Sequence, residues 1–191
     1  MSGNGGKSLV LSAVNASGVG LELNAVVIEF AEIIGLSEEI VDKFNEMPLD
    51  QGRHQAIGGA MWFTKEAESF NDLTEVKDLF TYLVSKEYNK FLWINAVRDA
   101  SSASEMETAV RTLVPILNET RQEIIASDPS NDLGLVGTNY TTTLFDINAM
   151  IETENNSEIA RIAEELFTQA EKETFFGVVR IADVLRAIID E

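Results

Sequence analysis

The spacing of the apolar residues constrains the fold of this chain more than any other feature. From residue 24 to the C-terminus, apolar side chains recur every three to four positions, which is the period of an α-helix with one buried face. Phe80, Val84 and Tyr88 show this spacing within one stretch. Hydrophobic residues make up 45% of the 191 residues, which suffices for a core at this length. We therefore predict an all-α fold, a globular bundle of about seven or eight helices.

Capping residues and helix breakers predict the helix boundaries in the first half of the chain. The predicted helices are 24–34, a second from Ser37 to just before Pro48, a third over about 53–70, and a long one from Asp72 or Thr74 to Ala100. Residues 1–23 lack the helical period. Two short apolar runs there, separated by Asn-Ala-Ser-Gly, predict a β-hairpin or an extended arm. We expect a single helical domain over 24–191.

Similar signals predict the helices of the second half. Ser104 with Glu107, and Thr143 with Asp146, have the spacing of a capping box, in which two side chains satisfy free amides of the first helical turn. Pro115 should kink or split the helix that follows the first box. The remaining predictions are a loop over 128–137, a helix from Thr143 that ends near Glu154, a helical region capped by Ser157, and a division of that region at Gly177.

Acidic residues are numerous and unevenly distributed. The chain has 32 Asp and Glu against 14 Lys and Arg, a net charge of -18, of which 21–52 carries -7, 53–100 carries -1 and 101–191 carries -11. Nucleic acids are bound through clustered basic residues, so we predict no direct nucleic-acid binding. No apolar run is long enough to span a bilayer, and no signal peptide is visible. Together with the lack of cysteine, this predicts a cytoplasmic or virion protein without a membrane contact.

The motifs that carry catalytic or metal chemistry are incomplete in this sequence. Gly6-Lys7-Ser8 lacks the earlier glycine and the preceding strand of a phosphate-binding loop. Segment 128–139 lacks the central glycine and the last acidic ligand of a calcium loop. His54 is the only histidine. We therefore predict no catalytic residue, no cofactor and no metal ligand, although a magnesium site made of carboxylates alone stays open.

Two apolar surfaces each have two interpretations, as part of the core or as an interface with another protein. Residues 175–189 are apolar over most of the helix circumference, with the polar side chains confined to about 120° of arc. The near-neutral stretch 62–93 holds eight of the fifteen aromatic residues. Domain cores and interface centres favour the same residue types. The interface candidates are Phe175, Phe176, Val179, Leu185, Ile188, Trp62 and Trp93.

Three functions fit this pattern. The first is a non-catalytic structural or assembly protein that self-associates or docks into a larger complex, of which a virion component is one example. The second is an acidic regulator or inhibitor of a basic, nucleic-acid-binding protein. The third is a hydrolase that uses carboxylates. The wide apolar stretch 175–189, the near-neutral aromatic stretch and the arm-like N-terminus favour the first function, with a protein partner or a second copy of the chain as the ligand. The lack of cysteine and the single histidine favour contact over catalysis.

Overall fold

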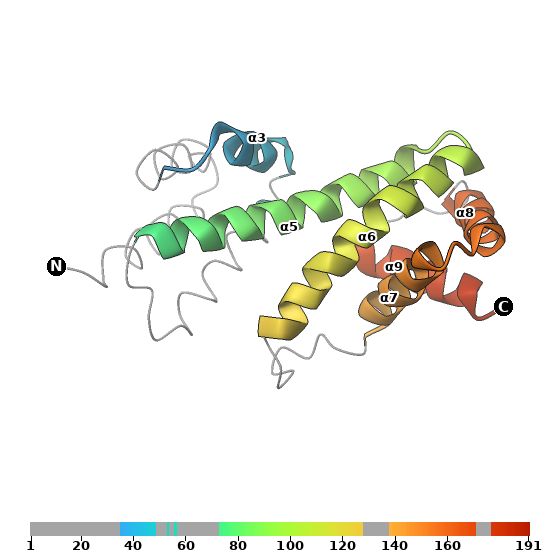
Figure 1. The fold of residues 1–191 in the computed structure, drawn as a ribbon. Coiled ribbons are helices and arrows are strands. Elements are labelled where there is room, and N and C mark those ends of the chain that lie inside the picture. The colour runs from blue at the N-terminus through green and yellow to red at the C-terminus, as the bar shows by residue number, and fades with distance from the viewer. Residues whose placement is uncertain (1–34, 49–52, 54–55, 57–72, 128–137, 171–176) are drawn as a thin grey trace. The chain divides into compact units, whose positions relative to one another are not determined.

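A computed structural model describes residues 35–48, 53, 56, 73–127, 138–170 and 177–191. Within these ranges the chain forms six helices and no strand (Figure 1). The helices are α3 (Glu38–Glu46), α5 (Leu73–Asp99), α6 (Ala103–Ser127), α7 (Asn139–Glu152), α8 (Asn156–Ala170) and α9 (Val178–Ile189). The predicted all-α class is confirmed for the described part. The number of seven or eight helices is not confirmed, and the hairpin or arm over 1–23 lies outside the described residues.

The chain divides into two compact units, which we call the N-terminal unit (1–88) and the C-terminal unit (89–191). The division into units does not test the predicted single domain over 24–191, which stays a prediction. None of the helices in the described ranges is both long enough and apolar enough to cross a bilayer.

In the N-terminal unit, α3 packs against the first half of α5. The Ser37 hydroxyl caps α3 by accepting from the Ile40 amide at 3.4 Å, as predicted, and the helix ends before Pro48. Phe44 is fully buried, and its ring centroid lies 6.0 Å from that of Phe80. The other buried apolar residues of this core are Ile40, Met47, Ala56, Leu83 and Val84.

Polar contacts fix the end of α3. Arg53 donates from Nε to the Met47 carbonyl at 2.7 Å and from Nη2 to the Asn45 carbonyl at 2.5 Å. These carbonyls lie at and just beyond the last turn, where no helical amide can reach them. The Tyr88 hydroxyl donates to Glu46 Oε2 at 2.6 Å and so ties α3 to α5. This hydrogen bond raises the pKa of Tyr88 above its ordinary value.

The core of the C-terminal unit lies among α6, α7, α8 and α9, with the end of α5 contributing Trp93 and Val97. Helix α6 packs on α7 and α8, and α9 packs on the same two helices. Fully or almost fully buried residues from all of these helices meet there: Trp93, Val97, Met106, Val110, Val114, Leu144, Ile147, Ile159, Ile162, Leu166, Ile181 and Leu185.

Both predicted capping boxes are wrong. Helix α6 begins at Ala103, and its cap is Ser102, whose hydroxyl accepts from the Glu105 amide at 3.2 Å. Helix α7 begins at Asn139 with Thr138 as its cap, so Thr143 lies inside the helix. Thr143 is fully buried, and its hydroxyl has no hydrogen-bond partner.

The remaining predictions for helix boundaries had mixed outcomes. Helix α6 continues through Pro115 and is not split, as Figure 1 also shows for the helix as a whole. Helix α8 begins at Asn156, one residue before the predicted cap Ser157. Gly177 directly precedes α9, which agrees with the predicted division of the last helical region. The predicted loop over 128–137 lies outside the described residues.

Ion pairs and hydrogen bonds join the helices at the edges of this core. Arg186 on α9 pairs with Asp146 on α7 at 2.5 Å and with Asp190 at 2.6 Å. Arg161 on α8 donates to the Ile188 carbonyl, at the end of α9, at 3.0 Å. The polar arc predicted for α9 therefore contributes to the contact with α7 as well as facing solvent.

Candidate functional site

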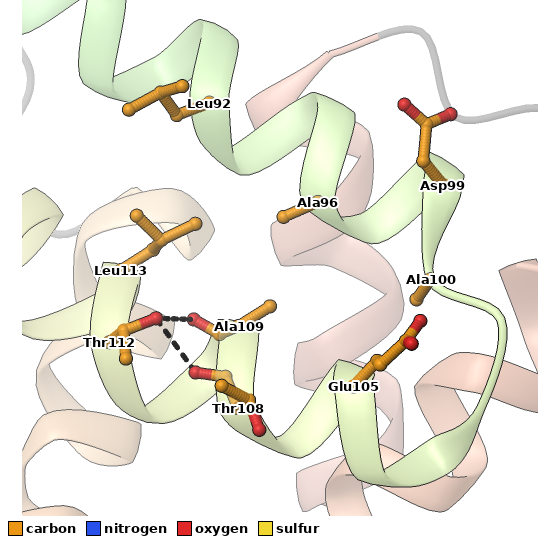
Figure 2. Close-up of a pocket in the computed structure, with 9 residues that line it drawn as sticks. All are labelled: Leu92, Ala96, Asp99, Ala100, Glu105, Thr108, Ala109, Thr112 and Leu113. Carbon is orange, nitrogen blue, oxygen red and sulfur yellow. Dashed lines mark hydrogen bonds between the residues drawn. The ribbon is translucent and has the colours of Figure 1, made fainter.

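An open hollow lies between the last turns of α5 and the first turns of α6, within the C-terminal unit (Figure 2). Its volume is about 430 Å³. That size is in the range of sites that take a ligand or a partner's side chains. Its apolar lining consists of Leu92, Ala96, Ala100, Ala109 and Leu113, and its polar lining of Asp99, Glu105, Thr108 and Thr112.

Helical spacing places these residues on two facing sides. On α5, Leu92, Ala96 and Asp99 are four and three residues apart, so they share one face. On α6 the same holds for Glu105, Ala109 and Thr112. Ile116, which is 40% exposed, continues the α6 face by one more turn. The alanines have short side chains and so leave the space that the larger residues at either side enclose.

The turn between the two helices is held by Glu105. Its Oε2 accepts from both the amide and the hydroxyl of Ser101 at 2.8 Å, while its own amide donates to Ser102. The hydrogen bond from the Ser101 amide is the largest cause that lowers the pKa of Glu105. Glu105 is therefore a carboxylate at neutral pH, at the end of the hollow where α5 leads into α6 (Figure 2).

Asp99 is the second carboxylate at this end. It accepts two hydrogen bonds from its neighbour Arg98, at 2.7 and 2.8 Å, and these lower the pKa of Asp99. Arg98 does not line the hollow. The charged residues in the lining are thus two ionised carboxylates, with no base among them.

The hydroxyl groups in the lining are engaged with the backbone of α6. Thr108 donates to the Ser104 carbonyl at 2.9 Å, and Thr112 donates to the Thr108 carbonyl at 2.8 Å. A hydroxyl nucleophile needs a base that takes its proton, and a general acid needs a raised pKa. The pKa values of Asp99 and Glu105 are lowered instead. The hollow therefore suits the binding of an apolar group beside a cation better than acid–base chemistry.

Of the seven predicted interface residues, the structure describes four: three share one core, and the fourth lies at the surface. Trp93, Leu185 and Ile188 are 1%, 0% and 4% exposed and lie in the core of the C-terminal unit. Val179, on the first turn of α9, is 60% exposed. Trp62, Phe175 and Phe176 lie outside the described residues, so for them both interpretations stay predictions.

Sequence reasoning did not single out the residues that line the hollow. A signal was present: Ala96 on α5, Ala100 directly after α5, and Ala109 on α6 are small residues close to the break between two predicted helices. Two helices joined by a short connection usually lie side by side, so small residues near that connection can leave a hollow. These alanines indicate a hollow only when it is known which sides of α5 and α6 face each other.

Among the described residues, no group of three or more His, Asp or Glu side chains is close enough to hold a metal ion. His54, Gly6-Lys7-Ser8 and most of the segment 128–139 lie outside those residues. Comparison with known proteins adds no identification, since no family model, curated protein or solved structure matches the chain.

Proposed function

We propose that this protein is a non-catalytic assembly protein that docks into a larger complex through the hollow between α5 and α6. The observation that carries the proposal is the hollow itself: about 430 Å³, with aliphatic walls and two carboxylates at one end. Protein interfaces are commonly organised around a pocket that takes a few apolar anchor residues of the partner, with polar groups at the rim.

Docking onto another protein is favoured over self-association through α9. Leu185 and Ile188, which would be the centre of an α9 interface, are used by the core of this chain. The net charge of -18 also opposes the approach of two identical surfaces at low salt. The hollow borders the same core, to which Ala109 belongs, and its other apolar lining residues are only partly buried, so they leave apolar surface for a partner.

The experiment places a photoreactive residue at Thr112, which is exposed and lines the hollow, and another at Ala160, which is exposed on α8. Irradiation in cells that make the protein should produce a cross-link to a partner from position 112 and not from position 160. The substitution Ala96→Trp fills the hollow and should abolish that cross-link, whereas Ala160→Trp should leave it unchanged. Equal cross-linking from both positions, or no effect of Ala96→Trp, would contradict the proposal.

A second candidate function is regulation of a basic protein by charge. Residues 89–191 hold 18 acidic and 8 basic side chains, a net charge of -10, so the C-terminal unit attracts a cationic surface over a distance of about 10 Å at moderate salt. Binding that rests on such attraction weakens steeply as ionic strength rises. A dissociation constant that does not change between 50 mM and 500 mM salt would exclude this second function and leave the first in place.

A further inference from the structure

The chemistry of the hollow identifies the kind of segment that occupies it. We propose that the occupant is an amphipathic α-helix of a partner protein, whose apolar face lies in the hollow and whose lysine or arginine lies at the end beside Asp99 and Glu105. This inference rests on the proposed docking function and adds to it the identity of the ligand.

The shape of the site favours a helix. The hollow between the facing sides of α5 and α6 is open, and its α6 side is lined by Glu105, Ala109 and Thr112. The exposed Ile116 continues this face of α6 by one turn beyond the lining, which gives an open trough along the helix. From Glu105 to Ile116 the helix rises by about 16 Å, or three helical turns. A third helix can place apolar side chains at positions i, i+4 and i+7 along such a trough, as ridges of one helix enter the groove of others.

The apolar walls favour large aliphatic side chains on that helix. Ala96, Ala100 and Ala109 leave room at the centre, and Leu92 and Leu113 border it (Figure 2). The hydroxyls of Thr108 and Thr112 already donate to backbone carbonyls of α6. An extended peptide would need donors and acceptors for its own backbone, which this lining does not supply, whereas a helix satisfies its backbone internally.

Charge complementarity favours a basic residue at one end of the helix. Both charged residues in the lining are carboxylates, and both are ionised at neutral pH. Asp99 is already paired with Arg98, whereas Glu105 accepts from the uncharged Ser101, so Glu105 is the carboxylate that attracts a partner's cation most strongly. Both residues are near the connection from α5 to α6, where Glu105 lies beside Ala100, so the charge is at one end of the hollow and not along it (Figure 2). The net charge of -10 over 89–191 adds attraction for any cationic segment and repels an anionic one. This asymmetry also predicts a fixed direction of the bound helix.

The experiment selects ligands from a displayed library of 16-residue amphipathic helices, in which the apolar stripe is kept and the charged positions are randomised. The full-length protein is the bait, and the Ala96→Trp variant removes sequences that bind elsewhere. We expect enrichment of sequences with Lys or Arg concentrated at one end. Enrichment of acidic or uncharged sequences, or of none that depend on Ala96, would overturn the inference.

A pair of double variants then locates the charge effect. Asp99→Asn with Glu105→Gln should weaken the selected peptide about three- to tenfold, because each exposed charge pair contributes modestly. The control, Glu154→Gln with Glu164→Gln, removes the same net charge from exposed positions that do not line the hollow. Equal weakening by both doubles would show a global charge effect and overturn the assigned place of the basic residue.

The two proposals fail in different ways. If the cross-link from position 112 depends on Ala96 but the selected helices carry no basic residue, docking at the hollow stands and the assigned partner chemistry is wrong. If the cross-link does not depend on Ala96, the docking function itself is wrong. A second copy of the chain as occupant would appear in the same cross-linking experiment as a product of twice the protein's mass.

Discussion

Two valines on α9 provide a matched test of which face of that helix is buried. Val184 is 9% exposed and packs in the core of the C-terminal unit, whereas Val179 is 60% exposed. The substitution of each by alanine is the same chemical change on the same helix. The difference between the two effects therefore measures burial, because the change in helix propensity is similar at both positions.

The expected magnitude follows from the area removed from water. Replacing valine by alanine deletes two methyl-sized groups, which costs about 1.6 kcal/mol when both are buried. A residual cavity adds to this cost, and the better helix propensity of alanine offsets about 0.5 kcal/mol of it. Val184→Ala should therefore reduce the free energy of unfolding by about 1–2.5 kcal/mol. Val179→Ala should change it by less than about 0.5 kcal/mol.

Fluorescence of Trp93 is a suitable probe, because this side chain is 1% exposed in the same core. The chain has two tryptophans, so a Trp62→Phe background isolates the signal. Urea titrations of both variants give the midpoint and the slope, and an unchanged slope shows that stability alone has changed. Equal losses, or a larger loss for Val179→Ala, would refute the packing described for α9.

Three other substitutions test local features of the C-terminal unit. Thr143→Val should raise the free energy of unfolding by about 1–2 kcal/mol, because it removes a buried hydroxyl that has no partner; a loss of stability in urea titration would mean that the hydroxyl is hydrogen-bonded. Glu154→Gly should stabilise by about 0.5–1 kcal/mol, because Glu154 has φ +54° at the end of α7, where glycine is favoured; Glu152→Gly, inside the helix, should destabilise in the same assay, and a gain there would contradict this reasoning. Because the pKa of Glu105 is lowered in the folded state, its contribution to the free energy of unfolding is present above the unfolded-state pKa near 4.5 and is lost as pH falls through the folded-state pKa. Glu105→Gln should therefore flatten the acid side of the stability–pH curve. An unchanged curve would contradict the assigned hydrogen bonds.

Helix boundaries could be predicted where one strong local signal acts alone. Ser37 and Pro48 bracket α3, because a serine cap and a helix-incompatible proline leave little freedom between them. The break after α5 was also predictable from the run of serines that follows Ala100. In both places the local preference and the packing of the helix agree.

Boundaries were wrong where two local signals compete. The sequence has capping-box spacing at Ser102 with Glu105 and at Ser104 with Glu107, and it is Ser102 that caps α6. The earlier start also lets Glu105 accept from Ser101, which closes the turn after α5. The spacing of the cap residues does not reveal this additional contact, so it could not decide between the two start positions.

Thr143 is not the cap of α7, and Pro115 does not split α6, because packing outweighs local preference. An earlier cap at Thr138 lets α7 begin sooner and bury Thr141 and Leu144 against the core. Pro115 removes one helical hydrogen bond, but its neighbour Val114 is fully buried and holds α6 in the core. Burial of this kind depends on residues distant in sequence and therefore cannot be seen in a single segment.

The candidate site was less predictable than the fold. Its lining combines α5 and α6 residues whose alignment depends on the length of the connecting turn and on the rotation of both helices about their axes. The aromatic and aliphatic residues that stood out in the sequence, such as Trp93 and Leu185, form the core instead. The space in the hollow is left by alanines, and a small residue gives no strong signal in the sequence, because its effect depends on the space between it and residues of another helix.

The central claim is that the protein binds a partner through the hollow between α5 and α6. The most direct test is the yield of the cross-link from position 112, measured in the wild type and in the two tryptophan variants. We expect Ala96→Trp to reduce the yield by about tenfold or more, which is the order of magnitude for the loss of an anchor pocket. Ala160→Trp should leave the yield within about twofold of the wild type. Equal yields in all three proteins would contradict it.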